Sequence, residues 1–280
     1  MPQSIIITGA SSGIGAEAAR QLSERREYAL ILCARSEEAL NNVAQEVSSA
    51  GSKVATIVGD ICDAETREEL CTKALEFGPI HGLVNNAGFG QPGPVELVSE
   101  EHARRQFDVN FFALAEMTRC VLPHMRKERA GRIVNVSSIL GRISIPLFGW
   151  YCASKHAVDA LSDSLRSEVR PFGIRVSLVE PGPIATGFTQ AADKASENFT
   201  LDADNDYVNH QAALRLNVSQ RFSKIGAHPR GTAKTIVHAL TAKRPKYIYR
   251  TTFLSRFASV MSWATPRALW NAMTARVYGV

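Results

Sequence analysis

The most uneven absence in this sequence is that of acidic side chains after Asp206. Residues 207–280 contain 12 Lys and Arg and no Asp or Glu, whereas residues 1–206 contain 20 basic and 27 acidic residues. The net charge of +5 therefore combines a segment of charge +12 with one of −7. Such a basic segment either packs against the acidic part of its own fold or meets something anionic, such as a membrane surface or an acidic substrate. No recognition helix or RNA-binding motif accompanies it, so we expect no nucleic-acid partner.

Long apolar runs and paired cysteines are also missing. No stretch approaches the roughly 20 apolar residues that a membrane-spanning helix needs, and the uncharged run Phe257–Pro266 is too short. Met1 leads directly into an apolar strand without a positively charged start, so we expect no leader peptide. The five cysteines form no Cys-x-x-Cys or Cys-x-x-His pair. We therefore expect reduced, mostly buried thiols, no metal site and a cytoplasmic protein.

What the chain does have is a regular alternation of strands and helices. The strands are short runs rich in Val, Ile and Leu, at Ser4–Thr8, Tyr28–Ala34, Lys53–Val58, Ile80–Asn85, Arg132–Val136, Ile174–Val179 and Tyr247–Tyr249. The helices between them are expected at Ile14–Arg25, after Ser36, after Asp63, at Glu100–Arg126 with an interruption at Pro123, and at Tyr151–Val169. Near-continuous apolar strands separated by helices predict a parallel sheet covered on both faces. The fold class is therefore α/β, with a doubly wound, seven-stranded parallel sheet.

Two segments depart from this rhythm within what we expect to be one Rossmann-type domain over residues 1–280. Residues 183–228 are polar and predict an insertion that acts as a substrate lid. Residues 251–280 form a C-terminal extension with apolar residues at helical spacing on both sides of Pro266. These helices are either part of the core, a wall of the substrate pocket, or an amphipathic anchor that lies on a membrane surface.

A glycine-rich turn follows the first strand and precedes a helix. It reads Thr8-Gly-Ala-Ser-Ser-Gly-Ile-Gly15, with candidate binding residues Gly9, Ser11, Ser12, Gly13, Ile14 and Gly15. Gly9 permits a tight turn, Gly13 lets a pyrophosphate approach the backbone, and Gly15 allows close packing of the helix. The helix N-terminus adds unpaired N–H groups and a partial positive charge. This context predicts a dinucleotide-binding site.

Arg35 stands 20 residues after Gly15, at the end of the second strand. NAD-specific sites usually carry an acidic residue there for the ribose 2′-hydroxyl. A guanidinium can instead grip a 2′-phosphate through two hydrogen bonds. We therefore expect NADP(H) as the cofactor, although Glu37 and Glu38 follow closely and leave NAD(H) open.

The ends of the next two strands carry further candidate cofactor contacts. Asp60 and Ile61 follow the third strand, and Asn86, Ala87 and Gly88 follow the fourth. Ligands of doubly wound sheets bind at the carboxyl ends of the strands. Asp60 can accept a hydrogen bond from an adenine amino group, and residues 86–88 can pass beneath the adenosine ribose.

Tyr151 and Lys155 are four residues apart and so share one face of a predicted helix. A phenol has a pKa near 10, and a nearby ammonium lowers that value by favouring the phenolate. Ser138 ends the fifth strand thirteen residues before Tyr151. Its hydroxyl can hold a substrate oxygen that Tyr151 protonates, so this trio predicts general acid–base chemistry.

Taken together, these motifs resemble the short-chain dehydrogenase/reductase family. The matching pieces are the turn Thr8–Gly15, Asp60, Asn85–Gly88, Asn110, Ser138, Tyr151–Lys155 and Pro181–Thr186. They occur in the family's order over about residues 3–250.

The resemblance assigns a role to each matching residue. It implies that Tyr151 is the acid and base, that Ser138 orients the substrate carbonyl, and that Lys155 holds the nicotinamide ribose and lowers the Tyr151 pKa. It implies that Asn110 bends the long helix and anchors a water of the proton relay. Ile184 and Thr186 would contact the carboxamide, next to Pro181 and Gly182. The basic residue that some NADP-dependent members carry in the glycine-rich turn is replaced by Ser12, so the NADP(H) preference depends mainly on Arg35.

The function expected is therefore an NADP(H)-dependent oxidoreductase that interconverts a carbonyl and an alcohol. The stretch Glu180–Phe188 and the long C-terminal extension are similar to members that act on steroids, retinoids and other lipophilic molecules. The resemblance further implies a homodimer or homotetramer, and the basic tail allows peripheral contact with a membrane. The alternatives are an NAD-dependent alcohol dehydrogenase, a non-catalytic NADP-binding sensor and an oligomeric scaffold.

Overall fold

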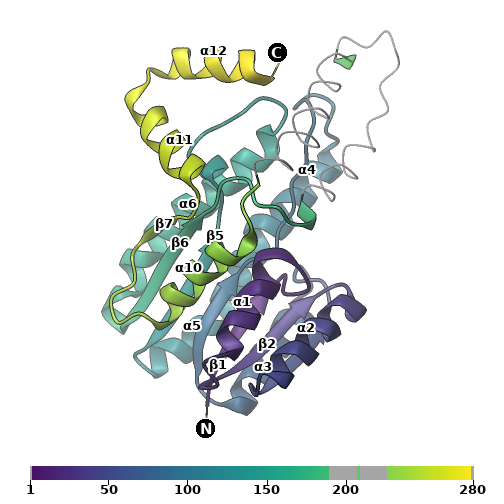
Figure 1. Cartoon of the computed structure of the whole chain (residues 1–280), viewed down its shortest axis with the longest axis vertical. Helices are drawn as coiled ribbons and strands as arrows, with labels where there is room; N and C mark the ends of the chain where they lie inside the picture. The colour runs from purple at the N-terminus through teal and green to yellow at the C-terminus, as the bar shows by residue number, and fades with distance from the viewer. Residues whose placement is uncertain (1, 189–206, 209–225, 279–280) are drawn as a thin grey trace.

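The computed structural model of the chain describes residues 2–188, 207–208 and 226–278. Its centre is a parallel sheet of seven strands in the order β3-β2-β1-β4-β5-β6-β7 (Figure 1). The strands are β1 (Gln3–Thr8), β2 (Tyr28–Ala34), β3 (Val54–Val58), β4 (Ile80–Asn85), β5 (Gly131–Val136), β6 (Ile174–Glu180) and β7 (Ile248–Arg250). The predicted doubly wound seven-stranded sheet is thus confirmed, with each strand end within one residue of its expected position.

Apolar side chains alternate between the two faces of the sheet because successive strand residues point in opposite directions. On β1, Ile5 and Ile7 face one apolar core and Ile6 faces the other, and all three are fully buried. The first core is covered by α1 (Gly13–Ser23), α2 (Glu37–Ser49) and α10 (Pro229–Thr241). The second is covered by α3 (Ala64–Phe77), α5 (Ala113–Lys127) and α6 (Gly149–Val169). Both faces are therefore covered by helices, as the near-continuous apolar strands predicted.

The predicted long helix between β4 and β5 is built from three pieces. These are α4 (Glu100–Phe107), the π-helical turn η1 (Asp108–Phe112) and α5. The expected interruption at Pro123 was wrong, because Pro123 lies within α5 on its exposed face, where a missing backbone hydrogen bond is least costly. The helix instead changes its hydrogen bonding at η1, and π-turns of this kind occur frequently at functional sites.

The two ends of the insertion lie side by side. Ile184 and Ala227 form an isolated parallel bridge, and Ala185 N–H donates to the Ala227 carbonyl at 2.9 Å. Most of the predicted lid, residues 189–206 and 209–225, lies outside the described residues. The chain therefore leaves the sheet after β6 and returns to nearly the same point before α10, a helix that the sequence patterns did not predict.

The C-terminal extension forms two helices, α11 (Phe253–Ala264) and α12 (Arg267–Tyr278), separated at Pro266 as predicted. Figure 1 shows both beyond the carboxyl ends of the strands, clear of the two faces of the sheet. No helix in the described part of the chain is long and apolar enough to cross a membrane. The short elements η2 (Ile139–Gly141) and η3 (Arg170–Phe172) complete the fold.

Candidate active site

The glycine-rich turn between β1 and α1 has a backbone that only glycine tolerates easily. Gly9 and Gly13 have φ values of +65° and +56°. A Cβ on Gly15 would lie 2.4 Å from the Gly9 carbonyl oxygen, so a side chain at Gly15 would push the turn away from the helix. Ser12 is the N-cap of α1, yet its side chain makes no capping hydrogen bond. The first N–H groups of α1 are therefore not satisfied by a side-chain cap and are suited to an anion.

The Asn86–Gly88 segment holds this turn in place. Asn86 Nδ2 donates to the carbonyl oxygens of Thr8 and Gly9, each at 3.0 Å. Thr8 Oγ1 accepts from the backbone N–H groups of Asn86 and Ala87, each at 3.0 Å. The end of β4 is thereby joined to the end of β1, so two of the predicted cofactor motifs form one rigid unit.

The segment after β6 lies on the other side of the turn. A Cβ on Gly13 would lie 3.0 Å from Thr186 Cγ2, which places Thr186 directly against the turn. Pro181 accepts a hydrogen bond from Ile139 N–H at 2.9 Å, and a Cβ on Gly182 would lie 2.4 Å from Thr252 Oγ1 at the start of α11. The structure therefore places Thr186 next to the glycine-rich turn, while Pro181 and Gly182 contact η2 and the start of α11.

Arg35 lies exposed just after β2, and within the described residues it makes no hydrogen bond or ion pair. Asp60 behaves differently, because Arg105 pairs with its Oδ2 and the Cys62 N–H donates to its Oδ1 at 2.9 Å. Burial acts to raise the pKa of Asp60, but these hydrogen bonds outweigh it and the pKa is lowered. Ile61 is buried beside it. Arg105 is a partner that spacing could not reveal, since it comes from α4.

Ser138, Tyr151 and Lys155 meet as predicted at the carboxyl end of β5. Ser138 caps η2, and its hydroxyl is hydrogen bonded to Tyr151. The Lys155 ammonium lies 5.8 Å from the centre of the Tyr151 ring and donates to the Val136 carbonyl at 3.0 Å. A Cβ on Gly88 would lie 3.6 Å from Lys155 Nζ, so this lysine also adjoins the dinucleotide-binding motifs.

Burial dominates the protonation of both ionisable groups. It raises the pKa of the Tyr151 phenol well above its ordinary value, and the hydrogen bond with Ser138 opposes this only in part. It lowers the pKa of Lys155 to about 8, against the attraction of Asp159. The expected lowering of the Tyr151 pKa is therefore not found for the protein alone, because desolvation of the buried phenol dominates and raises its pKa.

Asn110 occupies the centre of the π-helical turn and is fully buried. Its Oδ1 accepts from Phe89 N–H at 3.0 Å, while its Nδ2 donates to the Phe89 carbonyl at 3.0 Å and to Ser154 Oγ at 3.2 Å. The helix thus changes its hydrogen bonding at Asn110, the position where the resemblance implies a bend. The side-chain amide of Asn110 links this turn to the β4 loop and to α6, while its role in anchoring a water stays a prediction.

An apolar wall surrounds the Tyr151 ring, and the sequence patterns had not assigned it. The ring centre of Phe188 lies 5.5 Å from that of Tyr151, and that of Phe148 lies 6.3 Å away. Leu147 is buried with a φ of +64°, a conformation that is strained for a leucine and often found near functional sites. Ile145 completes the wall. A signal for these residues exists only in the tertiary structure, because they come from two separate loops.

A buried ionic network lies behind Lys155. Ser137 Oγ donates to Asp159 Oδ1 at 2.5 Å, and Arg142 bridges Asp159 at 3.2 Å and Glu180 at 2.9 Å. Arg250 contacts the other oxygen of Glu180 at 3.0 Å. Burial raises the pKa of Asp159 to about 7. Only the spacing of Asp159, one helical turn after Lys155, could have pointed to this network.

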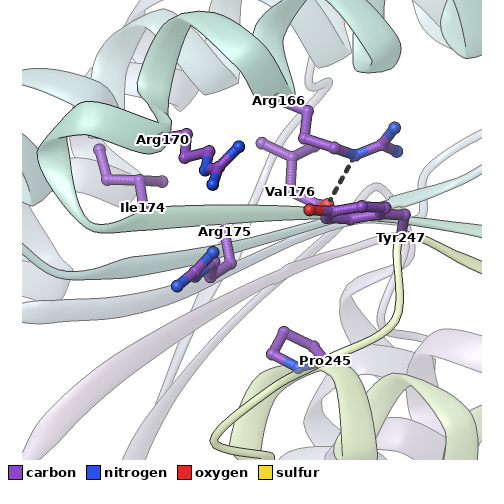
Figure 2. Close-up of a pocket in the computed structure, with 7 residues that line it drawn as sticks. All are labelled: Arg166, Arg170, Ile174, Arg175, Val176, Pro245 and Tyr247. Carbon is purple, nitrogen blue, oxygen red and sulfur yellow. Dashed lines mark hydrogen bonds between the residues drawn. The ribbon is translucent and has the colours of Figure 1, made fainter.

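A separate hollow lies at the opposite end of β6 (Figure 2). The Arg166 guanidinium lies over the Tyr247 ring, 4.6 Å from its centre, and Arg166 Nε donates to the Val176 carbonyl at 3.4 Å. Its accessible volume of about 10 Å³ leaves room for no more than about one water molecule. The residues lining it are Arg166, Arg170, Ile174, Arg175, Val176, Pro245 and Tyr247. It is too small for a dinucleotide, so the candidate site is the group of residues around Tyr151.

The family model for "short chain dehydrogenase" matches residues 3–197. The chain belongs to this family. It is 36% identical to the 3-ketodihydrosphingosine reductase of Bacteroides thetaiotaomicron over 276 residues, covering 97% of each chain. It is 34% identical to retinol dehydrogenase 8 of Bos taurus over 257 residues, covering 89% of this chain and 81% of the relative.

A crystal structure of a short-chain dehydrogenase/reductase from Burkholderia phymatum in complex with NAD has a TM-score of 0.83 and 27% identity, and the match covers 96% of this chain and 95% of that one. As a short-chain dehydrogenase, the protein is an oxidoreductase that acts on alcohol and carbonyl groups. In the described part of the chain, no group of His, Cys, Asp and Glu residues could hold a metal ion.

Proposed function

We propose that the protein is an NADP(H)-dependent reductase or dehydrogenase that interconverts a lipophilic carbonyl compound and its alcohol, with Tyr151 as acid and base. The observation that carries the proposal is that Tyr151 lies next to Ser138 and Lys155. These residues adjoin the Asn86–Gly88 segment, which is hydrogen bonded to the glycine-rich turn. A proton donor, an oxygen-binding hydroxyl and a cofactor cradle are the three parts that carbonyl reduction needs.

The residues present fit a dinucleotide. Gly13 has a positive φ, and a Cβ at this position would press against the Thr186 side chain, so the turn has no room for a side chain there. The first N–H groups of α1 have no side-chain cap. We propose that Gly9, Ser11, Ser12, Ile14 and Gly15 hold the pyrophosphate with Gly13. Asp60, Ile61 and residues 86–88 would hold the adenosine, and Pro181, Gly182, Ile184, Thr186 and Lys155 the nicotinamide riboside. When bound, the nicotinamide would supply or accept the hydride.

The chain's own residues would manage the proton. A phenol has an ordinary pKa near 10, and burial raises that of Tyr151 further, so its hydroxyl is protonated at neutral pH and can donate from Oη to the substrate oxygen during reduction. Ser138 Oγ can donate a hydrogen bond to the same oxygen and so orient it. In the oxidative direction the Tyr151 oxygen would accept the proton, and the adjacent Lys155 charge favours that form.

Replacement of Tyr151 by Phe tests the acid–base role. We expect kcat to fall at least about a hundredfold, the lower end of what a positioned acid contributes, while the NADPH affinity stays within about twofold. Turnover is measured as NADPH oxidation with a panel of long-chain ketones and aldehydes, and affinity by fluorescence titration. Tyr247→Phe is the control, because Tyr247 is exposed and lines the hollow at the opposite end of β6. Retained turnover in Tyr151→Phe would refute the mechanism, and no turnover in the wild type would favour the sensor or scaffold.

The NADP(H) preference depends on Arg35, which is exposed and free to bind a 2′-phosphate. An NAD-dependent dehydrogenase is the second candidate, because the similar structure from Burkholderia phymatum contains NAD. We expect Arg35→Asp to weaken NADP⁺ binding at least about tenfold more than NAD⁺ binding, since a hydrogen bond to a charged group contributes about 1.5–3 kcal/mol. Arg25→Asp, at the amino end of β2, should change neither affinity. Equal losses for the two cofactors in Arg35→Asp would remove Arg35 as the selecting residue.

Two observations support a lipophilic substrate. The wall around Tyr151 consists of Ile145, Leu147, Phe148 and Phe188. Two relatives are named for 3-ketodihydrosphingosine and for retinol, both lipophilic molecules. Phe188→Ser should raise KM for a long-chain ketone more than for a short one, because it removes apolar contact area. An equal change for both substrates would argue against this wall as the binding surface.

The remaining predictions concern assembly and location. We propose a homodimer or homotetramer, and Phe112 on η1 is an exposed apolar side chain that such an interface could cover. Light scattering on the purified protein tests this, and a monomer over the accessible concentrations would refute it. We also propose that residues 1–280 form a single domain with residues 183–228 as a substrate lid. We further propose that the protein is located in the cytoplasm.

A further inference from the structure

The helix α11 carries its large apolar side chains on the outside. Its inner face consists of small residues, of which Ser255 and Ala258 are buried against the body. Its outer face presents Phe253, Phe257 and Trp263, which are 83%, 53% and 88% exposed. An ordinary surface helix has the opposite arrangement, with its large apolar side chains toward the core. The outer face of α11 is therefore built for a partner rather than for the protein interior.

The next helix, α12, also carries exposed apolar side chains, and we call those of the two helices together the tail surface. The Phe253 and Phe257 rings are stacked with centres 6.1 Å apart, and Val260 follows on the same face. On α12, Leu269 and Met273 are spaced one turn apart and are about half exposed. Figure 1 shows that both helices extend past the carboxyl ends of the strands. The members of the tail surface are Phe253, Phe257, Val260, Trp263, Leu269 and Met273.

The charged side chains on α11 and α12 are all of one sign. Arg256, Arg267 and Arg276 are exposed on α11 and α12. The sequence has no acidic residue after Asp206, so no carboxylate on these helices offsets them. Exposed aromatic residues flanked by arginines are the composition that binds the interface of an anionic lipid bilayer. Tryptophan in particular prefers the boundary between the headgroups and the apolar chains.

The tail surface is attached firmly to the candidate active site. Thr252 Oγ1 accepts from Ser255 N–H at 3.0 Å, and Ser255 Oγ accepts from Thr252 N–H at 3.2 Å, which closes a capping box at the start of α11. A Cβ on Gly182 would lie 2.4 Å from this Thr252 oxygen. Arg256 Nε also donates to the Arg250 carbonyl at 3.0 Å. The helix is thus held beside residues 180–182, at the end of the sheet where substrate would enter.

We propose that α11 and α12 dock the protein onto membranes that contain anionic lipids. The apolar residues enter the interface while the arginines contact the headgroups, so that the candidate active site lies next to the bilayer. A second copy of the chain is a poorer occupant, because pairing two tail surfaces would place arginines against arginines. Docking itself does not depend on the proposed catalytic function, since it is measured without turnover.

Co-sedimentation of the purified full chain with lipid vesicles tests the proposal. We expect the protein to pellet with vesicles of phosphatidylcholine and phosphatidylserine, less with phosphatidylcholine alone, and progressively less as salt screens the arginines. Phe257→Ser/Trp263→Ser should weaken vesicle binding at least about tenfold. The matched control Val58→Ser/Leu75→Ser removes two exposed apolar side chains elsewhere and should bind like the wild type. Equal binding of the two double variants would overturn the proposal.

A second pair of variants separates the charge from the apolar contact. Arg267→Gln/Arg276→Gln should weaken binding to phosphatidylserine vesicles roughly fivefold per arginine and leave binding to phosphatidylcholine unchanged. Circular dichroism and fluorescence titration with NADPH establish that each variant is folded. If the wild type fails to pellet but light scattering shows a dimer that Phe257→Ser/Trp263→Ser dissociates, the tail surface is a subunit interface and the proposal is refuted. Failure to pellet without such a dimer refutes it equally.

Discussion

Tyr151 and Lys155 share one face of α6, and their burial moves both pKa values toward the neutral forms. The phenol keeps its proton, and the lysine has a pKa of about 8. Asp159, one further turn along α6, opposes the shift of Lys155 by its negative charge. Asp159 in turn faces Ser137, Arg142, Glu180 and Lys155, and burial raises its pKa to about 7. The protonation of each of these groups is therefore set by its burial together with the charges and hydrogen bonds of its neighbours.

The raised pKa of Asp159 predicts an unusual pH dependence of stability. Between its ordinary pKa of 3.8 and about 7, the folded protein holds a proton on Asp159 that the unfolded chain has lost. The free energy of unfolding should therefore fall as the pH rises through this window, by up to about 4 kcal/mol. Asp159→Asn should remove most of this fall, as measured by urea unfolding across the window. Asp163→Asn, an exposed carboxylate on the same helix, is the control, and identical slopes for wild type and Asp159→Asn would contradict the prediction.

Among the elements, the glycine-rich turn and α1 behave as one unit because they pack without room for a side chain. The Gly15 Cα faces the Gly9 carbonyl, and Asn86 bonds that same carbonyl from β4. A second unit joins η2, α6, β6 and β7, where Arg142 bridges Asp159 and Glu180, and Arg250 holds the other oxygen of Glu180. The cofactor side and the substrate side of the site are thus supported by different contacts, which separate substitutions can test.

Gly15→Ala should disturb the cofactor side. The added Cβ would lie 2.4 Å from the Gly9 carbonyl oxygen, so the turn must move away from α1. We expect NADPH affinity to fall at least about tenfold, since a misplaced turn loses its hydrogen bonds to charged phosphates, and the melting temperature to fall as well. Gly231→Ala in α10 is the control, because a Cβ there meets nothing within 4 Å. NADPH binding unchanged in Gly15→Ala would show that this close packing is not needed.

Arg142→Met should destabilise the fold more than Arg250→Met. Arg142 contacts two buried carboxyl groups, those of Asp159 and Glu180, whereas Arg250 contacts Glu180 alone. Breaking a buried pair costs about 3–5 kcal/mol because a charge is left uncompensated. The exposed pair of Arg104 and Glu100 provides the control, and Arg104→Met should cost under about 1 kcal/mol. Urea unfolding at neutral pH measures all three, and equal losses for Arg142 and Arg104 would refute the role of the network.

At the scale of the whole molecule, the fold separates a closed α/β body from segments attached at the carboxyl ends of its strands. The insertion leaves and returns at the bridge between Ile184 and Ala227. The helices α11 and α12 begin beside Gly182 and extend away from the sheet (Figure 1). Both attachments adjoin the candidate active site, while the two apolar cores lie elsewhere. Changes in these segments can therefore alter substrate binding without unfolding the body.

Replacing residues 189–224 by a short Gly-Ser linker should leave the body folded. The two ends are already held together by the hydrogen bond from Ala185 N–H to the Ala227 carbonyl, so a short linker can close the loop at small entropic cost. We expect a melting temperature within a few degrees of the wild type and nearly unchanged NADPH affinity. KM for long-chain ketones should rise, because the predicted lid is gone. Loss of NADPH binding, or an unchanged KM, would contradict the lid prediction.

The sequence by itself determined the features that depend on neighbouring residues. Near-continuous apolar runs marked the seven strands, and the glycines of Thr8–Gly15 and the spacing of Tyr151 and Lys155 marked the candidate site. These signals are readable because turn geometry, strand burial and the helical repeat are set within a few residues.

Only the tertiary structure decided what depends on distant contacts. The π-turn at Asn110, the partners of Asp159 and the raised pKa of Tyr151 arise from groups brought together by folding. The direction of the α11 apolar face was equally undecided, since its spacing fits a core helix or a surface one. Burial is a property of the whole packed molecule, so neither the protonation of the active-site phenol nor the outward face of α11 could be derived from local pattern alone.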